Sequence, residues 1–231
     1  MRAAVASDLH EVCNVQLHQK IGAEQKMIRS FLGFCVAASA LVPVAASAHV
    51  GVGEPHGFVH GFSHPFGGID HVLAMVAVGL FAAHLGGRAS WLVPLSFVSV
   101  MALAGIAGMI GVWLPFVEIG IGMSVVVLGL AVAFQFSVPT LVAMTFVGFF
   151  AIFHGHAHGA EMPETMSRLS YGAGFVCATA LLHAIGVSVG LAIGKTGDVH
   201  GPRIVQIAGS GMMITGVAIL IFHLLAVGGT S

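Results

Sequence analysis

Residues 64–85 read HPFGGIDHVLAMVAVGLFAAHL, and they place two histidines and a carboxylate at the start of a long apolar run. The chain has 231 residues, of which 57% are hydrophobic and only 7% are charged. Ionisable side chains at the depth of a membrane are costly and usually serve a function. The stretch therefore predicts a membrane helix whose first turn, with Asp70 and His71, carries chemistry.

Runs of similar character fill the rest of the chain. A helix that crosses the hydrocarbon core needs about 20 mainly apolar residues. Six such runs lie near residues 66–86, 90–113, 116–136, 138–157, 171–194 and 204–227, with glycine or proline at the breaks between them. We therefore expect an all-α integral membrane protein, a bundle of six transmembrane helices surrounded by lipid, with no room for a soluble domain.

A signal peptide is predicted at residues 27–48. Arg29 supplies its charged start, an apolar core follows, and an Ala-Ser-Ala sequence ends it before residue 49. An uncleaved anchor helix is the alternative, although the apolar core is short and is interrupted by Pro43. Cleavage would make His49 the first residue of the mature chain.

The remaining chain divides around this segment. Residues 1–26 are polar and have neither membrane nor signal character. We interpret them as a mis-assigned upstream extension with Met27 as the true initiator, and an unusually long start of the signal peptide is the alternative. Residues 49–64 are expected to form a histidine-rich periplasmic tail, and residues 65–231 the six-helix transmembrane domain.

The charges predict an orientation of the helices in the membrane. A cleaved signal peptide leaves the mature N-terminus outside, and six crossings return the C-terminus to the same side. The inner loops would then carry Arg88, Lys195 and Arg203, and the outer loops only Arg168, which agrees with the positive-inside tendency. Both termini are thus expected in the periplasm. The formal net charge of −1, with scattered basic residues, excludes nucleic-acid binding.

The first candidate metal site lies at the start of the first apolar run. We expect Pro65 in the first turn of that helix, with Ser63 or His64 as its cap. Imidazole nitrogen together with carboxylate oxygen, as in His64, Asp70 and His71, suits nickel, cobalt, copper or zinc rather than calcium or magnesium. The alternative is that Asp70 caps the helix and His71 is an ordinary core histidine.

The second candidate site is the sequence FHGHAHGAE at residues 153–161. If the helix continues through it, His154, His158 and Glu161 form one stripe. If a glycine ends the helix there, His156 and His158 become a chelating loop. A solvated histidine-rich loop without a transport role is the alternative to both. The predicted topology places this sequence on the same face of the membrane as the first site.

The tail offers further ligands. The free amine and the imidazole of His49 could chelate one ion. A secondary, metal-collecting set would consist of His56, His60 and, from the second candidate site, His156. Glycines at residues 51, 53, 57 and 61 disfavour a helix, so we expect a flexible tail. A tail with incidental histidines is the alternative.

The fifth run carries a stripe of small residues. Gly186, Gly190 and Gly194 recur every four residues, a spacing that allows another helix to approach closely. His183 shares that face and is expected to point into the bundle. After loss of the signal peptide Cys177 is the last cysteine, which excludes a disulfide framework and a thiolate metal site.

These segments together resemble a known family. The signal peptide ending before residue 49 and the sequences at residues 64–75, 153–161 and 171–186 are similar to those of the HupE/UreJ nickel and cobalt permeases. The resemblance covers essentially the whole mature chain. It implies import of Ni²⁺ or Co²⁺ across the inner membrane for hydrogenase or urease maturation, with the metallochaperones of those enzymes as downstream partners.

The resemblance also implies which residues bind the metal. The family's motifs match His64, Asp70, His71, His154, His158, Glu161 and His183. The spacing H-x5-D-H also resembles the H-x4-D-H signature of the larger nickel/cobalt transporter family, but it is one residue longer, so little is carried over from that family.

We therefore expect a carrier and not an enzyme, with no permanently bound cofactor and with Ni²⁺ or Co²⁺ as cargo. Asp70, His71 and His154 would be the first ligands, and His183 an inner ligand or relay. A membrane-embedded zinc hydrolase with Glu161 as its general base is one alternative. A nickel-binding accessory or sensor protein is the other, and homo-oligomerisation is left open.

Overall fold

A computed structural model describes residues 56–162, 167–195 and 201–228 of the chain. These residues form helices joined by short connections, and none of them lies in a strand. The signal peptide predicted at residues 27–48, the extension at residues 1–26 and the ligand predicted at His49 lie outside the described residues. Those three predictions stay predictions.

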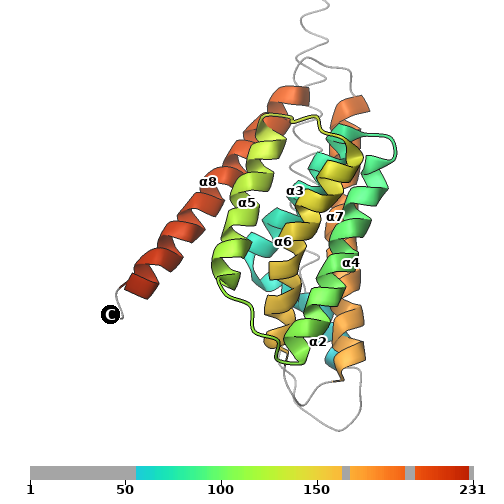
Figure 1. The fold of residues 1–231 in the computed structure, drawn as a ribbon. Coiled ribbons are helices and arrows are strands. Elements are labelled where there is room, and N and C mark those ends of the chain that lie inside the picture. Colours follow the sequence, from blue (N-terminus) through green and yellow to red (C-terminus); the bar gives the residue numbers. More distant parts are fainter. Residues whose placement is uncertain (1–55, 163–166, 196–200, 229–231) are drawn as a thin grey trace, which may run out of the picture. The chain divides into compact units, whose positions relative to one another are not determined.

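Six long helices coincide with the six apolar runs (Figure 1). They are α3 (Ile69–Leu85), α4 (Ala89–Met109), α5 (Val117–Ala133), α6 (Thr140–Ala160), α7 (Arg168–Lys195) and α8 (Gly201–Gly228). The predicted breaks act as turns: Gly86 and Gly87 have φ of 70° and 51°, and Pro139 directly precedes α6. Pro202 lies in the first turn of α8, where its missing N–H costs nothing. The all-helical bundle is confirmed.

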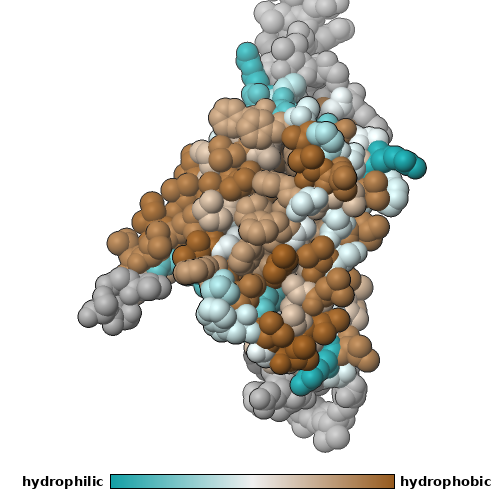
Figure 2. Space-filling view, viewed as in Figure 1, coloured by the Kyte–Doolittle hydropathy of each residue, from teal (hydrophilic) through white to brown (hydrophobic). Residues whose placement is uncertain are grey.

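The helices fit a multi-pass membrane protein. Four of them, α4, α6, α7 and α8, are long and apolar enough to cross a bilayer, and α3 becomes a fifth if it is joined to the bent segment before it. Helix α5 is apolar but has 17 residues, or roughly 25 Å at 1.5 Å per residue. The face of the described residues that Figure 2 shows is largely hydrophobic. The count of six crossings stays a prediction.

A short helix, α2 (His56–Ser63), precedes the bundle and corrects one expectation. The glycines at residues 57 and 61 were expected to prevent a helix here, because glycine lowers helix propensity. They instead allow close packing on α7: a Cβ at Gly61 would overlap the carbonyl of Tyr171, and one at Gly57 would lie 3.2 Å from Ser170. The tertiary contact overrides the intrinsic propensity.

The start of α3 also differs from the prediction. Pro65 lies in a separate 3-10 turn, η1 (His64–Gly67), and α3 begins only after Gly68, whose backbone is extended. The chain bends there by 85°. Ser63 makes no cap, because its hydroxyl donates to the carbonyl of His60 at 3.1 Å. The bend leaves Asp70 in the first turn of a helix whose N-terminus has no other side-chain cap.

Helix α3 is the centre of the bundle, in contact with each of α4 to α8, while α4 packs mainly on α6 and α5 on α8. The glycine stripe of α7 is confirmed in part. A Cβ at Gly186 would meet the carbonyl of Val76 on α3 and one at Gly190 would meet Ala83, whereas Gly194 has nothing within 4 Å. Backbone contacts between α3 and α7 thus set the depth of the side chains on both helices.

Candidate metal site

One end of the bundle gathers the predicted ligands. At this end α3 and α5 begin and α6 and α8 end, and Figure 1 shows it at the bottom, near α2. A cavity of about 530 Å³ opens there, lined by His60, His64, Asp70, His71, Glu118, His158, Glu161 and His223 among others. The structure therefore brings the two histidine motifs together, although about 80 residues separate them in the sequence.

The tightest set of ligand atoms comes from both motifs. His64, His158 and Glu161 each offer one ligand atom, and these three atoms lie within 4.8 Å of one another. His64 Nε2 is 3.4 Å from Glu161 Oε2. His158 is only 4% exposed, and neither of its ring nitrogens has a hydrogen-bond partner. Buried polar atoms without a partner are uncommon in folded proteins, so His158 is a candidate ligand.

Asp70 orients the ring of His71. Its Oδ1 accepts the backbone N–H of His71 and also the ring Nδ1–H, both at 2.8 Å. Because a carboxylate can only accept, Nδ1 carries the proton and Nε2 keeps its lone pair. Nε2 is buried and unpartnered. A carboxylate that orients a histidine in this way is the usual arrangement behind metal-binding imidazoles.

Ser124 does the same for His154, one layer deeper. Its hydroxyl donates to the carbonyl of Ile121 at 2.6 Å, so its oxygen accepts the Nε2–H of His154 at 2.8 Å. The other nitrogen, Nδ1, is then the free acceptor, and it is buried without a partner. The ring centre of His71 lies 4.8 Å from that of His154 and 4.3 Å from that of His158.

His183 lies in the interior, as predicted, with 1% of its surface exposed. Its Nδ1–H donates to the carbonyl of Met75 at 2.8 Å, which again leaves Nε2 as the unpartnered acceptor. The ring of Phe97 contacts both His154 and His183, with ring centres 5.7 and 5.1 Å apart. Phe97, on α4, therefore contacts one histidine of α6 and one of α7.

The remaining histidines of the two motifs lie outside this set. Helix α6 continues to Ala160, so His156 and His158 form no chelating loop. His156 points to the other side of α6, where its Nε2 donates to the carbonyl of Val112 at 2.6 Å. His60 is exposed at the rim of the cavity. His56 begins α2, and its side chain is not among the described ones.

Two ligand-type residues of the cavity were not predicted as site residues. Glu118 Oε2 lies 3.3 Å from His223 Nε2, and both line the cavity. Glu118 and His223 lie near the ends of apolar runs, where ionisable residues often mark a functional site, so the sequence could have indicated both. Ser124 gave no such signal, because a single serine in an apolar helix is common.

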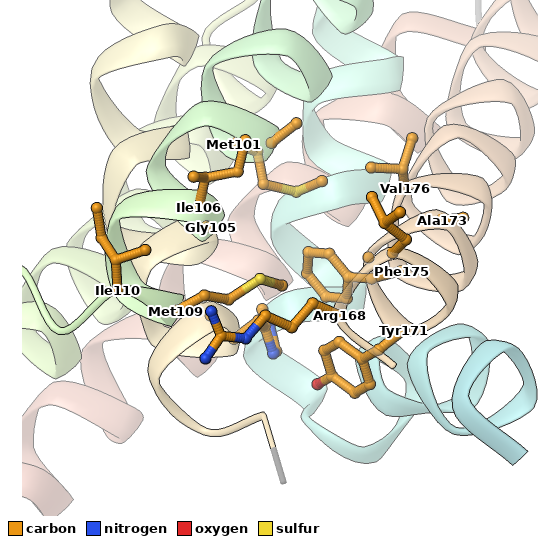
Figure 3. Close-up of a pocket in the computed structure, with 16 residues that line it drawn as sticks. Met101, Gly105, Ile106, Met109, Ile110, Arg168, Tyr171, Ala173, Phe175 and Val176 are labelled. Atoms are coloured by element: carbon orange, nitrogen blue, oxygen red, sulfur yellow. The ribbon is translucent and has the colours of Figure 1, made fainter. Parts of the chain in front are cut away.

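A second cavity adjoins the first through His158. It has a volume of about 480 Å³, is mostly apolar and lies between α4, α6 and α7 (Figure 3). Met109, Arg168 and Tyr171 lie along one edge of it. The hydroxyl of Tyr171 is buried without a partner.

Comparison with known proteins gives the chain's relatives. The family model described as HupE / UreJ protein matches residues 22–219. Protein HupE of Rhizobium leguminosarum bv. viciae is 45% identical over 185 residues, which cover 80% of this chain and 94% of that protein. No solved structure matches the chain.

Proposed function

This chain belongs to the HupE/UreJ family, and we propose that it is an inner-membrane permease that imports Ni²⁺, or Co²⁺, from the periplasm to the cytoplasm. The family is one of transport and accessory proteins and not of enzymes. Membership of this family therefore argues against the zinc hydrolase. Glu161, its only candidate base, also has 57% of its side chain exposed to solvent.

One observation carries the proposal: imidazoles with free lone pairs converge beside carboxylates at a single cavity. The acceptors at the cavity are Nε2 of His71 and one ring nitrogen of His158, and Nδ1 of His154 is buried next to His71. Glu161 and Asp70 supply the negative charge. Neutral nitrogen ligands with a few carboxylates favour late first-row divalent ions. Magnesium and calcium prefer oxygen ligands and would bind this set poorly.

The ligand set also suits a carrier, because transport requires release. No cysteine lines the cavity, so the strong thiolate bonds of storage and sensor sites are missing from it. The membrane potential can drive import. Two positive charges that move inward across ~100 mV release about 4.6 kcal/mol, so the chain needs no nucleotide site.

The distribution of charge supports the direction of transport. Among the described residues, the cavity end carries one basic residue, Arg168, beside Asp70, Glu118 and Glu161, whereas the opposite end carries Arg88 and Arg203. We place the acidic end in the periplasm, by the positive-inside tendency. Both mature termini then lie in the periplasm, after removal of residues 27–48 and with six crossings.

The tail and the partners complete the proposal. His49, His56 and His60 would collect metal at the mouth, by which we mean the histidine-lined cavity of about 530 Å³. The imported ion would pass to the metallochaperones of a hydrogenase or urease. The six crossings of residues 65–231 would form the permease, alone or as a homo-oligomer. An accessory or sensor protein would bind nickel at the same residues without moving it.

The test is uptake of radiolabelled nickel at nanomolar supply, in cells that lack their own high-affinity importers. We compare the wild type with Asp70→Ala and His71→Ala at matched membrane abundance. His84→Ala is the control, because His84 is exposed at the opposite end. We expect uptake in the wild type and the control, competed by cobalt and not by magnesium, and background uptake in both site variants. Wild-type uptake no greater than empty vector would overturn the permease proposal.

A further inference from the structure

We propose that His183 forms a second metal station, separated from the cavity cluster by Phe97, and that the ion leaves it through a cavity between α4 and α7. The inference rests on the proposed function and adds to it an internal binding site, a partition and an exit. It concerns the half of the bundle farther from the histidine-lined mouth.

His183 meets the requirements of a ligand on its own. Its ring is oriented by the Met75 carbonyl, and its Nε2 is buried without a hydrogen-bond partner. A buried imidazole nitrogen of this kind costs stability unless something occupies it. Thr179, one turn away on the same face of α7, is also fully buried, and its hydroxyl is likewise unpartnered. The interior of α7 thus carries two polar groups that the fold itself leaves unpaired.

A cavity begins at His183 and leads away from the mouth. Its volume is about 420 Å³, and His183, Ser90, Pro94 and Ser188 are among the residues that line it. Pro94 has no N–H, so the carbonyl of Ser90 one turn earlier loses its usual helical donor. Two hydroxyls and this carbonyl give a departing cation oxygen ligands along an otherwise apolar wall.

Phe97 separates the two stations. It is fully buried, and its ring contacts both His154 and His183, in a T-shaped arrangement with the latter. A buried phenyl ring keeps water from connecting the mouth with the inner cavity. The face of the ring attracts a cation, which lowers the barrier to a dehydrated ion in passage.

Helix α4, which carries Phe97, is better able to move than helices α3 and α7. Helices α3 and α7 are held by backbone contact, since a Cβ at Gly79 would overlap the carbonyl of His183. The bond between His183 and Met75 therefore lies in a rigid pair of helices. Helix α4 carries Phe97 three residues after Pro94, and an internal proline is the usual place for a helix to bend. We assign the opening of the partition to α4.

The experiment measures nickel binding and nickel uptake on the same variants of the full chain. Binding is measured on purified protein in lipid nanodiscs by equilibrium dialysis with radiolabelled nickel alone. Uptake is measured in importer-deficient cells. The variants are His183→Gln, whose amide can still donate to the Met75 carbonyl, and Phe97→Trp, which enlarges the partition. Phe149→Trp is the matched control, because Phe149 is on the exposed face of α6.

We expect His183→Gln to bind one nickel ion fewer per chain than the wild type and to lose about tenfold or more in uptake, as loss of a metal ligand commonly does. Phe97→Trp should bind as many ions as the wild type and still lose uptake. Phe149→Trp should match the wild type in both measurements. A Phe97→Trp protein with full binding also shows that the larger ring has not unfolded the bundle.

Two results would overturn the inference by itself. One is a His183→Gln variant that binds and carries nickel like the wild type while His71→Ala carries none. The other is a Phe97→Trp variant with undiminished uptake. A wild-type protein that carries no nickel in these cells would instead overturn the proposed function, and this inference with it.

Discussion

The two ends of the bundle both carry histidine, but only one of them surrounds it with ligands. At the mouth, His64, His71 and His158 face one another beside Asp70 and Glu161. At the opposite end His84 is exposed, and its Nε2 lies 3.4 Å from the hydroxyl of Ser137. A histidine in an apolar chain is thus not by itself a site. A metal site requires ligands from separate helices that converge in the protein interior.

The difference also concerns hydrogen bonding. His84 is exposed and can bond with water, so an absent partner costs it nothing. His71, His154 and His183 each have one ring nitrogen that is hydrogen-bonded to a protein acceptor. The other ring nitrogen of each is buried without a partner. Buried unpartnered nitrogens are rare in folded proteins and call for an occupant.

The largest difference is expected between His158→Ala and His84→Ala. His158 lies in the closest ligand set and has two free nitrogens, so its loss should lower nickel uptake by about 100-fold or more, the upper range for metal-site residues. His84→Ala should stay within about twofold of the wild type, because an exposed side chain at the other end contacts no ligand. Initial rates of radiolabelled nickel uptake at equal membrane abundance measure both. Equal losses in the two variants would remove the distinction between the ends.

A smaller loss is expected from Asp70→Asn, which keeps the shape of the side chain and removes its charge. The ring of His71 would lose its charged acceptor and part of its basicity, so nickel affinity should fall about 10- to 100-fold. Equilibrium dialysis of the purified variant measures the change. Wild-type affinity in Asp70→Asn would mean that the carboxylate only caps the helix.

Ser124→Ala should have a milder effect, because the serine acts through His154. Without the serine oxygen either nitrogen of His154 can carry the proton, and the free lone pair is no longer directed. We expect nickel affinity to fall about threefold to tenfold, below the range for a direct ligand. The control is Ser96→Ala: the hydroxyl of Ser96 donates to the Val93 carbonyl at 2.8 Å, away from the histidines. Identical affinities in the two variants would contradict the role of Ser124.

The smallest effect on the ligands themselves is expected from the glycines that position them. Gly155 lies against the carbonyl of Met101, so Gly155→Ala forces α4 and α6 apart and should cost about 1–3 kcal/mol of stability. Gly211→Ala, where nothing lies within 4 Å, should be neutral or slightly stabilising. Thermal unfolding of both variants in detergent gives the comparison. Equal melting temperatures would show that α4 and α6 can separate without cost.

Much of this architecture could be predicted from the sequence, because membrane helices are encoded by hydropathy and by the glycines and prolines between them. The six apolar runs correspond to α3 through α8, and the shared location of the two histidine motifs followed from topology alone. The inward orientation of His183 followed from its register with Gly186. Each of these depends on local pattern or on counting crossings.

What could not be predicted depends on contacts between distant residues. Helix α2 forms because Gly57 and Gly61 let it settle on α7, a contact that no local propensity contains. The role of Ser124 depends on its distance from His154, 30 residues away. Glu118 joins the mouth only because α5 begins where α6 ends. Pairings of this kind become visible only once the helices are packed.

His158 borders two chambers at once: the polar mouth and the apolar cavity between α4, α6 and α7. The second cavity is lined mostly by apolar side chains, so it suits hydrophobic molecules that the polar cavity would exclude. A hydrophobic compound dissolved in the bilayer could therefore lodge beside this imidazole without competing with metal for the aqueous route. The imidazole that we propose as a metal ligand is also the point that a lipid-soluble inhibitor would reach from the apolar cavity.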